Sequence, residues 1–424
     1  MVKYKFLALT FLYIVIATSF ASILGVNVQS IYRVPFISIR WIDVAILTII
    51  FIYFNGLQFK ERLYSNDKLI IRLCYVFLLF LIAQLIRSWH ITDINSQVSH
   101  FICNLSIFII IDLLTFKIDP QDIVLFIKKF AILGSFVLIF SNFFTLYSFI
   151  SGGTIFSDSD IRVALNVAGE KESVYKEGLI ALVYVFGLYI FQNKSKIWEK
   201  VVFITAILSI YVSLVYSFGR GLVFMIASIT IIYVLVFSKK LVNALIQVFI
   251  IILLLVMFYF LFGNTLRQKG YDPIQRISEI IKYSVDVDNP DWDKGRSFSR
   301  KYAIDAWKES IWTGYGYDDL SNHGLPSETG TAHNFIVTSL FHNGIIGTFI
   351  YLLILLLLFR NSIKLWPLLS EHNYSNDIMK LLVISSFFWI IPAWTQEAFW
   401  EKHSLTIQFM YMGLISNYYK QKIV

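Results

Sequence analysis

Long apolar runs follow one another along most of the chain. About 20 such residues cross the hydrocarbon layer of a bilayer as one helix. Twelve runs approach or reach this length: residues 6–24, 41–57, 69–86, 100–116, 130–150, 178–192, 201–217, 221–237, 242–262, 334–359, 381–394 and 405–419. The pattern predicts an all-α polytopic membrane protein with about twelve transmembrane helices, and residues 1–424 as one integral membrane domain.

The longest polar interruption is residues 263–333, between the ninth and tenth runs. Within it, Asp272-Pro273 is a favourable helix start, and residues 274–285 repeat apolar side chains on one helical stripe. Residues 297–312 show a similar spacing and end at Thr313-Gly314. We expect two surface helices in this inserted loop. They either lie flat on the outer leaflet or form a plain helical hairpin, and periodicity alone does not separate the two.

The distribution of Lys and Arg predicts which side of the membrane each loop occupies. If both termini are cytoplasmic, the cytoplasmic segments carry 19 of these cations and the short external loops carry 8. Cytoplasmic loops of membrane proteins are enriched in Lys and Arg. The loop 263–333 then faces outward (the periplasmic side), and its nine cations against eleven acidic residues make it slightly acidic.

Composition supports this interpretation and excludes other classes. The chain is 57% hydrophobic and only 15% charged, which no soluble domain of this size could accommodate. The net charge of +8 fits cytoplasmic anchoring rather than nucleic-acid binding. Cys74 and Cys103 both fall in apolar runs, so no disulfide or metal framework is expected. Phosphate-cradling, metal-binding and hydrolase motifs are absent from the sequence, so we expect neither metal nor cofactor.

Arginines are the first candidates for chemistry. Arg220 lies in the turn Ser217-Phe-Gly-Arg-Gly between two apolar runs, where flanking glycines let backbone approach a ligand. The alternative is an arginine that extends to the interface. In the loop, Arg276, Arg296 and Arg300 offer guanidinium groups that match phosphate oxygens. Their alternative is pairing with the acidic residues of the loop.

A histidine opens the tenth run. His333-Asn334 stands where the chain enters the membrane, and an imidazole there could act as a general base. The alternative is a capping or interfacial histidine. His342 lies about 180° around a helix from His333, so we expect it to pack rather than to face the same site. Arg162, in the polar external stretch 151–177, is a further candidate for substrate binding.

These motifs carry a resemblance to a known family. Their order is Gly295-Arg296, Ala303, Gly314-x-Gly316, His333-Asn334 and Gly344-x-x-Gly347, preceded by the Ser-Phe-Gly-Arg-Gly turn two spans before the loop. This order resembles the O-antigen ligase and polymerase superfamily, bacterial membrane glycosyltransferases with a GT-C-like fold. The motifs cover roughly residues 215–350.

The resemblance implies a reaction and its participants. The donor would be a glycan on undecaprenyl diphosphate, with the lipid in the bilayer. Arg220 and Arg296 would bind the diphosphate, with Arg300, Arg276, Arg162 and Asn334 as further substrate contacts. His333 would take the proton from the acceptor hydroxyl. The transfer would invert the anomeric centre and need no metal or nucleotide.

The resemblance leaves the acceptor open. We expect a polymerase that makes O-antigen or capsular polysaccharide at the outer face of the bacterial cytoplasmic membrane, with a chain-length regulator as a candidate partner. The alternatives are a ligase that transfers the finished glycan to lipid A–core and a teichoic-acid or protein oligosaccharyl transferase. From other classes, a transporter or flippase of lipid-linked sugars and a structural membrane subunit remain open.

Overall fold

The computed structural model describes residues 68–88, 107–115, 118–150, 177–193, 195–217, 220–237, 296–316, 318, 320–323, 334–388 and 402–423, with five single residues between 249 and 264. Every regular element in these ranges is a helix, which confirms the all-α class. The helices are α5 (Lys68–Ser88), α7 (Ile107–Thr115), α8 (Pro120–Ile150), α9 (Glu177–Gln192), α10 (Ile197–Ser217), α11 (Arg220–Phe237), α14 (Arg296–Glu309), the 3-10 turn η3 (Leu320–His323), α15 (Phe335–Leu368), α16 (Tyr374–Phe388) and α18 (Lys402–Ile423).

Helices of membrane-span character confirm a membrane protein. Within the described ranges, Lys68–Arg87, Pro120–Phe140 and Phe335–Leu368 are long and apolar enough to cross a bilayer. Shorter apolar helices cover Gly178–Phe191 and Met225–Phe237. The predicted runs 6–24 and 41–57 lie outside the described residues, as does most of 242–262. The count of about twelve spans therefore stays a prediction.

The start of α8 differs from the expected boundary at residue 130. The helix begins at Pro120, where Oδ1 of Asp119 accepts a hydrogen bond from the Gln121 amide at 2.8 Å. Proline fits the first helical position because its missing N–H needs no partner there. Lys128 lies within this helix, and its ammonium group pairs with the buried Glu199 of α10 at 2.8 Å.

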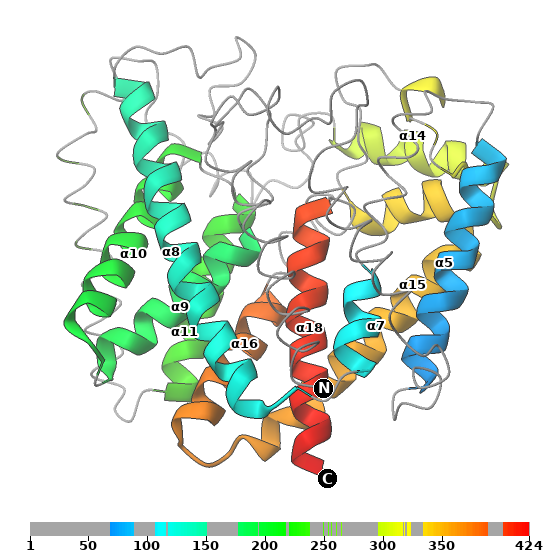
Figure 1. The fold of residues 1–424 in the computed structure, drawn as a ribbon. Helices are drawn as coiled ribbons and strands as arrows, with labels where there is room; N and C mark the ends of the chain where they lie inside the picture. The colour runs from blue at the N-terminus through cyan, green and yellow to red at the C-terminus, as the bar shows by residue number, and fades with distance from the viewer. Residues whose placement is uncertain are drawn as a thin grey trace, which may run out of the picture.

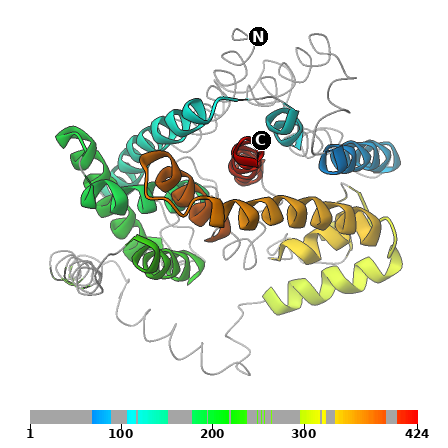
Figure 2. The ribbon, with the colours of Figure 1, turned by 90° about the horizontal axis from the view of Figure 1, so that it is seen from below.

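Two groups of helices pack on either side of α18 (Figures 1 and 2). One group joins α8, α9, α10, α11 and α16 around a large apolar core. The other joins α5, α7 and α15 around a second core. α18 contributes Tyr411 to the first core and Phe409 and Met412 to the second. Its central position holds the two groups together.

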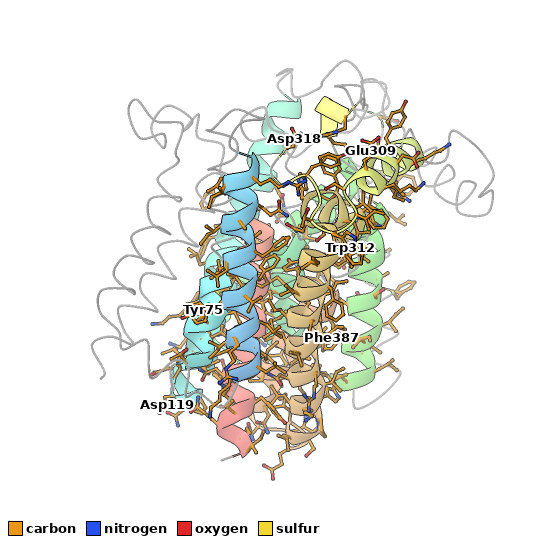
Figure 3. All side chains as sticks on the ribbon, turned by 90° about the vertical axis from the view of Figure 1, so that its right-hand side faces the viewer. Tyr75, Asp119, Glu309, Trp312, Asp318 and Phe387 are labelled. Carbon is orange, nitrogen blue, oxygen red and sulfur yellow. The ribbon has the colours of Figure 1, made fainter. Side chains whose placement is uncertain are left out.

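Different elements mark the two ends of the molecule. α14 lies across one end of the upright helices (Figure 1), and Glu309 and Asp318 mark this end in Figure 3. Asp119 lies at the opposite end, close to the last turn of α18, where the Gln421 side-chain amide donates to the Ile118 carbonyl. Helix α14 belongs to the loop that we predict to be external, so the α14 end is the end of interest.

Candidate functional site

Helix α15 is broken close to the α14 end. Gly344 has φ 58° and ψ −166°, inside an element that is otherwise helical from Phe335 to Leu368. This backbone conformation is essentially restricted to glycine. The break interrupts the hydrogen bonds between successive turns, so the polar backbone groups on both sides of Gly344 need other partners.

The segment that follows α14 supplies those partners. On the near side of the break, the carbonyls of Phe341 and His342 accept from the amides of Tyr315 and Gly316, each at 2.8 Å. On the far side, the Ile345 amide donates to the Ile311 carbonyl at 2.9 Å, and the Ile346 amide donates to the Trp312 carbonyl at 3.1 Å. We call this exchange of four backbone hydrogen bonds the interlock. Irregular backbone within a membrane helix needs such partners from the protein, unless it lines a water-filled cavity.

Glycines make the interlock possible on both sides. Gly314 has φ 66° and Gly316 has φ 70°, conformations that other residues rarely adopt. A Cβ atom on Gly314 would lie 2.5 Å from the Gly344 backbone nitrogen. A Cβ atom on Gly344 would in turn collide with the carbonyl group of Trp312. The Gly314-x-Gly316 and Gly344 motifs are therefore two halves of one contact.

Side chains near the end of helix α5 bind the segment that forms the interlock. The Arg87 guanidinium donates to the Gly314 carbonyl at 2.9 Å, to Oγ1 of Thr313 and to Oγ of Ser310 at 3.3 Å. The Gln84 side-chain amide donates to the Thr313 carbonyl. These bonds tie a predicted external end of a span to the predicted external loop.

Helix α14 packs along the first half of α15. Ala303 and Ala306 pack with Phe341 in a small core that also contains Leu320. On an α-helix, residue 296 lies about 20° from residue 303 around the axis, and residue 300 lies about 60° from it. Arg296 is the first residue of α14, and the side chain of Arg300, one turn later, is partly buried.

Arg220 is the first residue of α11. The last residue of this helix, Phe237, packs on Tyr189, and Lys380 lies 6.0 Å from its ring centroid. Lys380 belongs to α16, and the connection from α15 to α16 lies at the end of the molecule opposite α14 (Figure 1). Because α11 is 18 residues long, its first residue, Arg220, lies about 25 Å from Phe237 along the helix axis.

Asn334 caps the start of α15. Its Oδ1 accepts from the amides of Ile336 at 3.0 Å and Val337 at 3.2 Å. The substrate contact predicted for Asn334 stays a prediction, and it would have to share the side chain with this cap. His342 packs as expected: its Nδ1 donates to the Gly316 carbonyl at 2.7 Å and thereby adds to the interlock.

Other predicted site residues lie outside the description. His333, Arg162 and Arg276 are among these, and for Arg220 and Arg296 only the backbone is described. Their roles stay predictions. Among the described residues, no group of three His, Cys, Asp or Glu side chains could hold a metal ion.

Sequence reasoning missed a second histidine at this end. Nε2 of His323 donates to Oδ2 of the buried Asp318 at 2.7 Å, and its ring lies 4.0 Å from the Tyr315 ring. The Tyr315 hydroxyl donates to Glu309 at 3.1 Å. Partial burial raises the pKa of Tyr315 the most, and the bond to Glu309 raises this pKa further. The phenol therefore stays protonated. A spacing of five residues between Asp318 and His323 carries no periodic signal, and the sequence could not reveal the pair.

Residues 204–352 match the family model described as "O-Antigen ligase". The matched segment contains α11, α14, the interlock and the first half of α15, and it confirms the resemblance to the O-antigen ligase and polymerase superfamily. Among curated proteins, none matches this chain.

Proposed function

We propose that this protein is a glycosyltransferase that polymerises undecaprenyl-diphosphate-linked repeat units into O-antigen or capsular polysaccharide. It works in the bacterial cytoplasmic membrane, with both termini inside and the α14 end facing outward. The donor is the growing glycan on its lipid diphosphate, and the acceptor is a single lipid-linked repeat unit. A chain-length regulator is a candidate partner.

One observation carries this proposal. The family match and the interlock cover the same segment, and the interlock fixes α14 against the start of α15. The helix that carries Arg296 and Arg300 is thereby held beside α15, which begins two residues after His333. A transferase needs such fixed groups, because preorganised charges stabilise a transition state without reorganising during the reaction.

The chemistry follows from the charges that the reaction develops. The acceptor oxygen forms a bond to C1 of the donor sugar while the C1–O bond to the diphosphate breaks. The electron pair of that bond leaves with the undecaprenyl diphosphate, whose growing charge Arg220 and Arg296 stabilise. His333 takes the proton of the acceptor hydroxyl. Attack opposite the leaving group inverts C1.

The second candidate is the ligase reaction, which the description of the matching family favours. Both reactions use the same donor and the same displacement at C1. They differ in the acceptor: a lipid-linked repeat unit for a polymerase, and lipid A–core for a ligase. The acceptor assay therefore decides between them.

Purified protein in liposomes should convert undecaprenyl-diphosphate repeat units into a ladder of longer glycans that remain attached to the lipid. Transfer to lipid A–core alone would establish the ligase reaction instead. Failure to transfer to either acceptor, with the protein folded and in the membrane, would contradict both.

Substitutions test the assigned residues. Arg220→Ala, Arg296→Ala and His333→Ala should each abolish product while the protein remains in the membrane. Arg360→Ala is the matched control, because this exposed arginine lies in the last part of α15, well beyond the break. Its ladder should equal that of the wild type. Normal ladders from the first three variants would refute their roles.

A further inference from the structure

The pair formed by Asp318 and His323 has no part in the reaction described above. We propose that His323, oriented by Asp318 and packed against Tyr315, binds a neutral hydroxyl group of the acceptor sugar. This inference rests on the proposed transferase function and assigns the acceptor side of its site.

In a neutral imidazole, this geometry places the ring hydrogen of His323 on Nε2. A carboxylate only accepts hydrogen bonds, so Nε2 of His323 carries the hydrogen in its 2.7 Å bond to Asp318. Nδ1 is then the acceptor of the neutral ring. Only 2% of Asp318 is exposed, so the carboxylate is held in place inside the protein. The His323 side chain is 20% exposed, so part of this side chain is accessible from outside.

Aromatic contacts fix the ring to the interlock. The ring centroid of His323 lies 4.0 Å from that of Tyr315 and 5.5 Å from that of Phe341, edge-on. The amide of Tyr315 itself donates to the carbonyl of Phe341 at 2.8 Å, which joins the segment after α14 to α15. A movement of His323 would therefore disturb the packing of both chain segments. Such rigidity suits a binding group, because little freedom is lost when a ligand arrives.

The surrounding charges select the kind of group that binds. Asp318 lies against the imidazole, and Tyr315, whose ring packs against it at a tilt of 45°, donates to the carboxylate of Glu309. Arg87 is a cation near Tyr315, and its guanidinium is bonded to the carbonyl of Gly314 and to two hydroxyl groups. This environment disfavours a diphosphate and favours an uncharged hydroxyl. The donor diphosphate and the acceptor sugar would thus bind at different places on the same end of the protein.

The position along α15 fits one extended acceptor. Phe341, which touches His323, lies seven residues after Asn334, about 10 Å along the helix. An oligosaccharide whose attacking hydroxyl lies at the start of α15 could reach His323 with a neighbouring sugar. His323 is then a positioning residue: it determines how tightly the acceptor binds, and another group takes the proton.

The test measures acceptor and donor kinetics separately in reconstituted protein. His323→Ala should raise the KM for the acceptor about tenfold, as expected for the loss of one hydrogen bond. Its kcat should stay within about twofold and its donor KM should not change. His323→Gln should restore most of the acceptor affinity, because the amide can donate to Asp318 and accept from a hydroxyl. Asp318→Asn should raise the acceptor KM with the donor KM unchanged.

A matched control exists at the opposite end of the molecule. His372 also contacts an aspartate, Asp377, at 3.4 Å, and His372→Ala should leave both KM values unchanged. An unchanged acceptor KM in His323→Ala would overturn the inference while the transferase function stands. A fall in kcat with a matching rise in donor KM would also overturn it, because it would indicate a structural role. A wild-type protein that transfers no sugar would overturn the proposed function itself, and the acceptor role with it.

Discussion

Two long helices, α8 and α15, are held in the structure in different ways. α8 runs through 31 residues, and its buried side chains, such as Ile123, Ile127 and Phe130, pack into a large apolar core. α15 runs through 34 residues but is broken at Gly344. Its break is closed by backbone groups of another segment. Side-chain burial thus holds the bundle, whereas specific backbone contacts hold the candidate site.

The difference lies in what each region can tolerate. An apolar core accepts changes of shape when side chains can move aside. Backbone groups that exchange hydrogen bonds at close approach cannot move aside without breaking those bonds. We therefore expect substitutions of similar size to have large effects in the interlock and small effects in the bundle.

The largest effect is expected for Gly344→Ala. The added methyl group would collide with the Trp312 carbonyl, and alanine would be strained at φ 58°. We expect a loss of about 3 kcal/mol in the free energy of unfolding, measured by denaturation in detergent. Transfer activity should fall below detection in the protein that still folds. Wild-type stability in this variant would contradict the described break.

Arg87→Ala should have the next largest effect. It removes the bonds from α5 to Ser310, Thr313 and Gly314, and hydrogen bonds from a charged group contribute about 1.5–3 kcal/mol. Because part of the guanidinium is near the surface, we expect a loss near the lower limit. Arg87→Lys should recover only part of it, because an ammonium group lacks the planar fork. Full recovery would show that charge alone matters.

Asn334→Ala should cost about 1 kcal/mol in the free energy of unfolding, the usual value for a lost helix cap. Asn334→Asp keeps an oxygen acceptor for the amides of Ile336 and Val337 and should restore stability. The transfer activity of Asn334→Asp separates capping from substrate contact. If Asn334→Asp is stable but inactive, the residue also contacts the substrate, as the sequence predicted. If it is stable and active, capping is its main role.

The smallest effect is expected for Gly187→Ala in α9. A methyl group there would lie 2.6 Å from Cδ1 of Ile207, the flexible end of a side chain. Alanine also favours the helix by about 1 kcal/mol over glycine, which offsets the cost of moving Ile207. The melting temperature should change little. A loss as large as that of Gly344→Ala would remove the contrast between the two regions.

Much of the fold follows directly from the sequence. The run 69–86 became α5 (Lys68–Ser88), and 178–192 became α9 (Glu177–Gln192), because continuous apolar stretches determine where helices can lie in a membrane. The apolar run 130–150 left out the first ten residues of α8, because these include charged side chains such as Lys128, whose partner Glu199 lies far away in the chain.

The site was less accessible from sequence. The glycines of Gly314-x-Gly316 and Gly344-x-x-Gly347 were evident, but their mutual contact depends on tertiary structure. The second loop helix was expected over residues 297–312, yet α14 ends at Glu309 because the following residues turn to meet α15. His323 showed no local signal, since its partner Asp318 and its neighbour Phe341 come together only after folding.

The interlock is the central claim, and a cysteine cross-link tests it most directly. Trp312 and Ile346 are exposed and joined by a backbone hydrogen bond of 3.1 Å, so cysteines at these positions should lie within disulfide range. In a background of Cys74→Ala and Cys103→Ala, Trp312→Cys with Ile346→Cys should form a disulfide rapidly under mild oxidation. Trp312→Cys with Phe349→Cys, about 4.5 Å further along α15, should not. Absence of the first cross-link, or equal formation of both, would contradict the account.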